Sequence, residues 1–136
     1  MNKKHPESKK RSGFTLVELV VVVLILGIIA AIATPKMFDT AGDARDNASK
    51  QSLIVLREAI ELYRAQTGSF PTAANITTQL GDYLKGPFPA PQVGNKVSTV
   101  VASTEDPLAV EAGGAGWVYN QTTGDIAINH ASYISW

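Results

Sequence analysis

The sequence has no cysteine and only two histidines, which excludes several kinds of chemistry. Without cysteine the chain can form no disulfide and offers no thiolate nucleophile or thiolate metal ligand. The histidines, His5 and His130, lie too far apart in the sequence for a metal-ligand pair. The motifs of serine hydrolases, P-loop proteins, dinucleotide-binding proteins and zinc metalloproteases are also missing. The composition therefore predicts a protein that is not an enzyme.

The formal net charge of +0 hides a division of charge along the chain. Residues 1–13 carry five basic side chains and one acidic one, Glu7, whereas the rest of the chain is more acidic than basic. An acidic body does not attract nucleic-acid phosphates, so we expect no nucleic-acid partner. The body's acidic residues also lack the compact spacing of a calcium loop. We therefore expect no cofactor, and calcium binding is unproven. The basic residues of the leader are Lys3, Lys4, Lys9, Lys10 and Arg11. The acidic residues of the body considered as calcium ligands are Asp82, Glu105, Asp106, Glu111 and Asp125.

Residues 14–33 form an apolar block, FTLVELVVVVLILGIIAAIA, in which Glu18 is the only charged residue. As a helix this block would span roughly 30 Å, about the thickness of the hydrocarbon core of a membrane. The basic residues before it are expected to stay on the cytoplasmic side. The block therefore predicts a single-pass anchor in the cytoplasmic (inner) membrane, with the N-terminus in the cytoplasm and the body outside.

Two other interpretations of the apolar block remain open. Ala31-Ile32-Ala33 is similar to a signal-peptidase site, so the block could be a secretory signal peptide that releases a binding domain or an enzyme beginning at Thr34. A plain membrane anchor would need only length and flanking charge. Neither interpretation explains why an acidic group, Glu18, stands inside the block.

Residues 10–19, KRSGFTLVEL, resemble the class III signal of type IV prepilins and type II secretion pseudopilins. The resemblance combines a basic leader, the glycine Gly13, the aromatic Phe14, a Thr-Leu pair and the lone glutamate Glu18. It continues through Gly27 and Pro35 and weakens beyond them. The chain departs from the major subunits of both groups, because it has neither a clear acidic calcium loop nor a C-terminal disulfide loop.

The resemblance implies that a membrane prepilin peptidase cuts the chain between Gly13 and Phe14 and methylates the new amine of Phe14. It also implies a role for Glu18. A charged group deep in an apolar helix costs roughly 2.5 to 3.5 kcal/mol in a bilayer, so it needs a partner inside a packed filament. The resemblance supplies the Phe14 ammonium of a neighbouring subunit, and this pair would fix the axial register of each subunit.

The function implied by the resemblance is that of a structural subunit, most like a pseudopilin of a type II secretion pseudopilus. The implied partners are the peptidase, identical or related subunits and an inner-membrane assembly platform. The assembled filament would lie in the periplasm or on the cell surface. A type IV pilus subunit for adhesion, motility or DNA uptake is the nearest alternative.

The remaining pattern predicts the fold. Thr34-Pro35 indicates a break, either a kink in one long helix with Gly27 as a second weak point or the end of the membrane helix. Residues 43–67 have the periodicity of an amphipathic helix that ends near Thr67. Its apolar face consists of Leu53, Leu56, Ile60 and Tyr63, while Arg57 and Glu61 have the spacing of a weak surface ion pair.

Turn-forming residues in 68–95 predict a long loop with a short helical turn at 78–85. Three β-prone runs follow at 96–102, 116–120 and 125–129, and we expect them to form an antiparallel sheet. Residues 132–136 either add an edge strand or pack on a neighbouring subunit. The predicted fold class is α+β and pilin-like, with a long kinked transmembrane and amphipathic helix packed on this sheet. The predicted segments are a basic leader at 1–13, a membrane and assembly helix at 14–35, an amphipathic helix at 36–68 and a globular region at 69–136.

Overall fold

Helix α1 is the longest element of the computed structural model, which describes residues 13–136 apart from the side chains of Lys36, Phe38 and Asp39. It runs over 52 residues, Leu16–Thr67. The predicted basic leader lies outside the described residues, except for Gly13. The chain divides into two compact units, Met1–Thr40 and Ala41–Trp136, which are described separately.

In the first unit, α1 continues through Pro35. The proline removes one backbone donor, but the neighbouring helical hydrogen bonds remain and the Thr34 hydroxyl donates a further bond to the Ala30 carbonyl, at 2.7 Å. The alternative in which the membrane helix ends at Pro35 is therefore wrong. The kink assigned to Gly27 and Pro35 stays a prediction.

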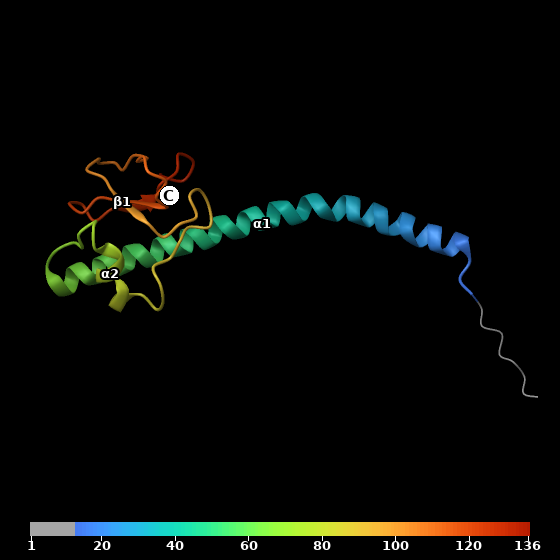
Figure 1. Cartoon of the computed structure of the whole chain (residues 1–136), viewed down its shortest axis with the longest axis horizontal. Coiled ribbons are helices and arrows are strands. Elements are labelled where there is room, and N and C mark those ends of the chain that lie inside the picture. Colours follow the sequence, from blue (N-terminus) through green and yellow to red (C-terminus); the bar gives the residue numbers. More distant parts are fainter. Residues whose placement is uncertain (1–12) are drawn as a thin grey trace, which may run out of the picture. The chain divides into compact units, whose positions relative to one another are not determined.

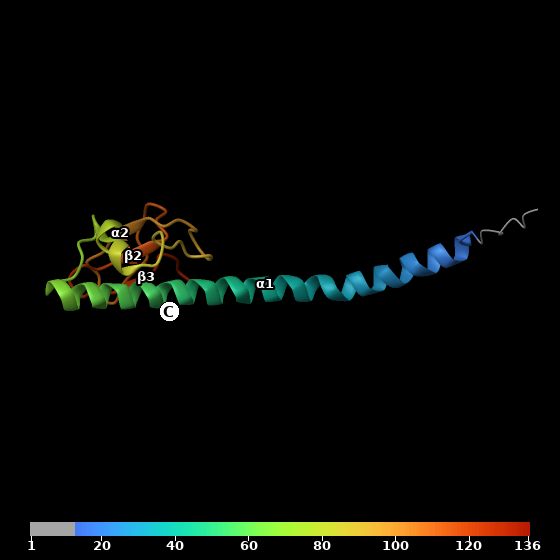
Figure 2. The ribbon, with the colours of Figure 1, turned by 90° about the horizontal axis from the view of Figure 1, so that it is seen from below.

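In the second unit, the small sheet packs on the C-terminal part of α1 (Figures 1 and 2). The predicted apolar face of this helix is confirmed, since Leu53, Leu56 and Ile60 are at most 2% exposed and Tyr63 packs against the core they form. Residues from the loop and the sheet complete that core: Ile76, Leu80, Val93, Trp117, Tyr119, Ile126 and Ile128.

Helix α1 ends at Thr67, as the sequence predicts. Gly68 follows with a φ of 80°, a conformation that glycine adopts without strain, and its N–H donates to the Arg64 carbonyl at 2.8 Å. The loop beyond contains the short helix α2 (Ile76–Gln79) and the 3₁₀ turn η1 (Gly81–Tyr83). Helical structure thus occurs where a short turn was expected, but it begins earlier, at Ile76.

The sheet has three strands in the order β1-β2-β3, with β1 at Val100–Ala102, β2 at Trp117–Tyr119 and β3 at Ile126–Ile128. Strands β2 and β3 form the predicted antiparallel pair. Strand β1, however, pairs with β2 in parallel, so the expectation of a fully antiparallel sheet is wrong. The segment between β1 and β2 is long enough to carry the chain back to the starting edge, which a parallel pair requires. The fold class, α+β with a long apolar N-terminal helix, is confirmed, with a mixed sheet.

The last residues of the described chain form turns and no strand, so the predicted edge strand at 132–136 is wrong. The ring of Trp136 lies instead against α1 of the same chain, with the Lys50 ammonium 4.3 Å from its centroid. Tyr133 meets Trp136 edge-on at a centroid distance of 4.7 Å. An aromatic pair therefore covers part of the helix face next to the core.

Candidate processing and assembly site

The predicted cleavage junction is open in the structure. Gly13 and Phe14 precede the first helical residue, Leu16, and the Phe14 side chain is 83% exposed. A methyl group added at Gly13 would meet no other atom within 4 Å. Backbone outside a helix and free of neighbouring side chains is the form of chain that a peptidase can bind in an extended conformation. The geometry is therefore compatible with cleavage between these two residues.

Immediately after the junction, Thr15 and Glu18 cap the start of α1. The Glu18 Oε2 atom accepts hydrogen bonds from the Thr15 N–H at 2.9 Å and from the Thr15 hydroxyl at 3.0 Å. In return the Glu18 N–H donates to Thr15 Oγ1 at 3.2 Å. This reciprocal arrangement is a capping box, which satisfies backbone N–H groups that the first helical turn leaves unpaired. The carboxylate also lies at the positive end of the helix dipole.

The capping box bears on the proposed processing in two ways. Its hydrogen bonds use only groups of Thr15 and Glu18, so cleavage before Phe14 leaves them in place. Both bonds to the carboxylate end on Oε2, and no hydrogen bond within the described residues ends on Oε1. One carboxylate oxygen thus organises the helix start, and the other faces outward and can accept a donor from another molecule.

Sequence reasoning missed the role of Thr15, although the signal was present. Thr15-Leu16-Val17-Glu18 is the Thr-x-x-Glu pattern of a capping box before an apolar run. From the sequence alone, these residues indicate only the resemblance, and Glu18 is a charge that needs a partner from another subunit. The structure gives Glu18 a local partner in its own chain as well.

The apolar stretch of α1 after Glu18 is exposed in the described part of the first unit. Its most apolar 18-residue window is 0% buried, and within the described residues α1 is the one helix long and apolar enough to cross a membrane. This property rests on length and composition. The exposed apolar side chains of the block include Leu19, Val20, Val21, Val22, Val23, Leu24, Ile25, Leu26, Ile28, Ile29 and Ile32.

The other predicted site residues are spread along the helix. Gly27 lies inside α1, where a methyl group would meet nothing within 4 Å, and Pro35 follows about two turns later. The structure therefore brings Gly13, Phe14 and Glu18 together at the helix start and places Gly27 and Pro35 apart from them. Across the described part of the chain, no group of three or more acidic residues or histidines is placed to hold a metal ion.

Comparison with known proteins points to the same end of the chain. Residues 8–34 match the family described as the prokaryotic N-terminal methylation motif. Type II secretion system core protein G of Pseudomonas aeruginosa is 32% identical over 66 residues, which is 48% of this chain and 46% of that protein. The core protein G of Aeromonas hydrophila is 30% identical over a match of the same extent.

The matched regions are partial. The core protein G of Vibrio cholerae is 33% identical over 64 residues, covering 47% of this chain and 44% of the relative. The chain thus spans less than half the length of these curated relatives, and no solved structure matches it. The resemblance predicted from residues 10–19 is confirmed. The chain carries a prokaryotic N-terminal methylation motif at residues 8–34 and, over about half of its length, is similar to the core protein G of type II secretion systems.

Proposed function

We propose that this protein is a structural subunit of a pseudopilus or a related type IV pilus-like filament, and that it acts by assembly and not by catalysis. The observation that carries the proposal is the helix start, where an exposed Gly13-Phe14 junction precedes a capped Glu18 and an uncovered apolar helix. An apolar helix that its own chain does not cover must be covered by lipid or by other helices. The helix of a membrane subunit is surrounded first by lipid and then, after the subunit enters a helical bundle, by other helices.

The first step proposed is processing at the membrane. A prepilin peptidase cuts between Gly13 and Phe14 and methylates the new amine of Phe14, which removes the basic leader. Methylation keeps the positive charge of that amine. Before assembly the subunit lies in the inner membrane, with its N-terminal end on the cytoplasmic side because of the preceding lysines and arginine.

The second step proposed is assembly through Glu18. Its Oε1 atom accepts a hydrogen bond from the Phe14 ammonium of a neighbouring subunit, while Oε2 stays in the capping box with Thr15. A charge-assisted bond of this kind is strong in an apolar surrounding and is lost when two helices slide out of register. Glu18 would therefore set the axial position of each incoming subunit, and an inner-membrane assembly platform would supply the subunits.

The pseudopilus is favoured over a pilus for adhesion, motility or DNA uptake because the relatives reported above are named as type II secretion proteins. The finished filament would then lie in the periplasm. Softness at Gly27 and Pro35 would let the helices bend inside it. The proposal includes no cofactor and no nucleic-acid partner.

Two substitutions separate the charge of Glu18 from its capping role. Glu18→Gln keeps an oxygen that can accept from Thr15 but carries no charge, whereas Thr15→Val removes the hydroxyl and keeps the charge. We expect both variants to be cut and methylated normally, as measured by the mass of the mature N-terminus. Glu18→Gln should lower the yield of sheared filaments at least tenfold, since a hydrogen bond to a charged group contributes about 1.5 to 3 kcal/mol.

Thr15→Val should retain most of the filament yield, because a cap contributes only about 1 kcal/mol and the ion pair is intact. Normal filaments from Glu18→Gln would contradict the proposed ion pair. A mature protein that begins at Thr34 would contradict the whole proposal and favour a cleaved secretory signal.

A further inference from the structure

A hollow of about 220 Å³ lies beside α1 in the second unit, lined by Lys50, Leu53, Ile54, Arg57 and Trp136. Leu53 is buried beneath it, and Ile54 is 47% exposed. Trp136 forms one wall, with its ring over Lys50. The hollow therefore combines an apolar floor with cations at its rim.

In the described part of the chain, no Asp or Glu side chain forms an ion pair with either cation of this hollow. Sequence spacing suggested that Arg57 pairs with Glu61, but Glu61 instead pairs with Arg64 at 3.9 Å. Arg57 Nη2 donates to two carbonyl oxygens, those of Trp136 at 2.7 Å and Ile126 at 3.2 Å. The hollow therefore presents two basic side chains beside apolar ones, and it suits a segment that carries carboxylates next to apolar side chains.

The same chain presents such a segment after β1. Residues 104–110, TEDPLAV, include the exposed Glu105 and Asp106, and Val110 is 48% exposed. We call residues 104–110 the acidic loop. No hydrogen bond or ion pair of the described residues uses either of the two side-chain carboxylates. The acidic loop thus carries the charge that the hollow lacks.

Buried polar groups hold the acidic loop in one shape. Ser103, 6% exposed, receives the Glu105 N–H at 3.2 Å and donates to Glu111 Oε1 at 2.7 Å. The buried Asn120 donates to the Glu105 carbonyl at 3.1 Å, and the buried Asn129 bonds both the N–H and the carbonyl of Glu111. A loop ordered in advance loses little conformational entropy on binding, which favours a role in recognition.

The hollow and the acidic loop lie on different sides of the second unit. In Figures 1 and 2 the orange chain that follows β1 runs on the side of the sheet away from α1, whereas the hollow lies on α1 itself. They cannot meet within one molecule. Two different surfaces of one chain that fit each other form a head-to-tail contact, and such contacts repeat from copy to copy into rings or filaments.

We propose that the acidic loop of a second copy of this chain docks in the hollow formed by Lys50, Ile54, Arg57 and Trp136. The carboxylates of Glu105 and Asp106 then face the two cations, and the apolar end of the loop covers Ile54. This inference rests on the proposed filament function. It adds a contact between the bodies of neighbouring subunits to the contact between their helices.

Engineered disulfides test this contact directly, because the natural chain has no cysteine. The full-length chain with both Ile54→Cys and Val110→Cys is expressed in cells that assemble wild-type filaments, and sheared filaments are oxidised with diamide. A disulfide forms only when the two Cα atoms come within about 7 Å. We expect a ladder of multimers on a non-reducing gel, because each copy links to a copy on either side.

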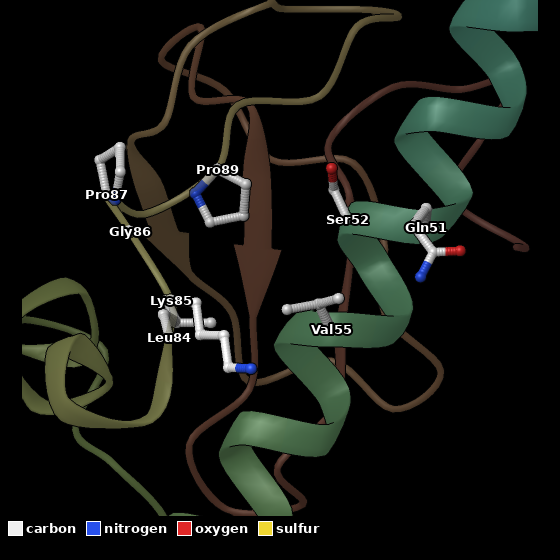
Figure 3. A pocket seen from close by; sticks show the side chains of 8 residues that line it. All are labelled: Gln51, Ser52, Val55, Leu84, Lys85, Gly86, Pro87 and Pro89. Atoms are coloured by element: carbon white, nitrogen blue, oxygen red, sulfur yellow. The ribbon is translucent and has the colours of Figure 1, made fainter.

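A second groove on the other side of α1 provides the matched control. Figure 3 shows Val55 pointing from α1 toward Lys85, across a groove of about 240 Å³ that Pro87 and Pro89 also line. Lys85 is exposed and cationic, as Lys50 is. The chain with Lys85→Cys and Val110→Cys should therefore stay monomeric after oxidation. Ladders of equal strength from both pairs, or dimers alone from the Ile54 pair, would overturn the proposed contact.

Charge reversal decides the matter if the cysteine variants fail to assemble. Lys50→Glu or Asp106→Lys should lower filament yield roughly fivefold, the ratio that corresponds to an exposed ion pair of about 1 kcal/mol, and the double variant should recover most of it. Lys85→Glu should have no effect. No recovery in the double variant would overturn the contact, as would monomers only from cysteine variants that do assemble. Absence of filaments from the wild-type chain would instead refute the proposed function, and this contact with it.

Discussion

The substitution Asn129→Asp changes one buried atom and should make the stability of the body depend on pH. Asn129 is 2% exposed, and its side chain has a fixed orientation. Its oxygen accepts from the Glu111 N–H at 2.8 Å, and its nitrogen donates to the carbonyls of Glu111 at 2.9 Å and Ala115 at 3.2 Å. The new carboxyl keeps the first bond, but its second oxygen faces two carbonyl oxygens and repels them when it is ionised.

The size of the effect follows from these contacts. In its neutral form the carboxyl can donate to only one of the two carbonyls, so the variant loses one hydrogen bond, or about 1 kcal/mol. Burial and the facing carbonyls raise the pKa of the introduced carboxyl above the value of about 3.9 that it has in the unfolded chain. Each unit by which the folded pKa exceeds the unfolded one adds about 1.4 kcal/mol to the loss near neutral pH.

The sign of the pH dependence is fixed by the direction of this pKa change. A folded pKa that is raised above the unfolded one adds stability that is fully present below about pH 4 and is lost as the pH rises through the folded pKa. The variant should therefore be about 1 kcal/mol less stable than the wild type near pH 4, and the loss of stability should be larger near pH 7.

Urea unfolding of the full chain in detergent micelles measures this difference. The fully buried Trp117 supplies the fluorescence signal. Asn129→Ala removes the same bonds without adding a titrating group, so its cost of roughly 2 to 4 kcal/mol should be equal at both pH values. A difference that does not change with pH would refute the orientation assigned to the Asn129 amide.

Three further substitutions test the core, one turn and one exposed helix position. Burial raises the pKa of Tyr119 to about 12 from an ordinary value of 10.0, so wild-type stability should fall by up to about 3 kcal/mol as the pH rises from about 10 through 12. Tyr119→Phe should lack that loss of stability at alkaline pH. It should also be about 1 kcal/mol less stable near neutral pH, because the Tyr119 hydroxyl donates to the Pro71 carbonyl at 3.0 Å. An unchanged loss of stability at alkaline pH, measured by urea unfolding, would contradict this. Gly124→Ala should lower stability by about 2 to 3 kcal/mol, because Gly124 has a φ of 83° and the added methyl group would overlap the Phe70 ring. Gly42→Ala, inside α1 with open space around it, should instead raise stability by about 0.5 to 1 kcal/mol, measured by the same urea unfolding. Equal changes in stability at Gly124 and Gly42 would contradict the close packing of Gly124 on Phe70.

Local pattern was enough to predict the features that depend on neighbours along the chain. The helical period found Leu53, Leu56 and Ile60, because one helix face must be apolar when it lies under a sheet. The end of α1 near Thr67 was likewise predictable from local pattern. The direction of β1 was not predictable in this way, because β-prone residues mark a strand but carry no information on which way a distant segment returns.

Contacts between segments far apart in the sequence were not predictable for single residues either. Arg57 has helical spacing to Glu61, but its guanidinium instead donates to carbonyls that the fold brings from the far end of the chain. Ser49 is polar and fully buried, which no local pattern indicates. Its hydroxyl donates to the Arg45 carbonyl and accepts from the Gln92 N–H, at 2.8 Å each, so its burial leaves no hydrogen bond unmade.

Among the described side chains of α1, Ser49 is the first that is fully buried, and this position divides the helix into two stretches under different constraints. Downstream of Ser49, a substitution on the buried face of the helix is tested each time the protein folds, because the chain itself surrounds those side chains. Upstream, the 18-residue apolar window has no such cover, so a change there leaves the melting of the body almost untouched and is tested only when lipid or another subunit surrounds it. Sequence change upstream of Ser49 is therefore restrained by other molecules. A substitution in one subunit there is tolerated only as far as its neighbours can accommodate it.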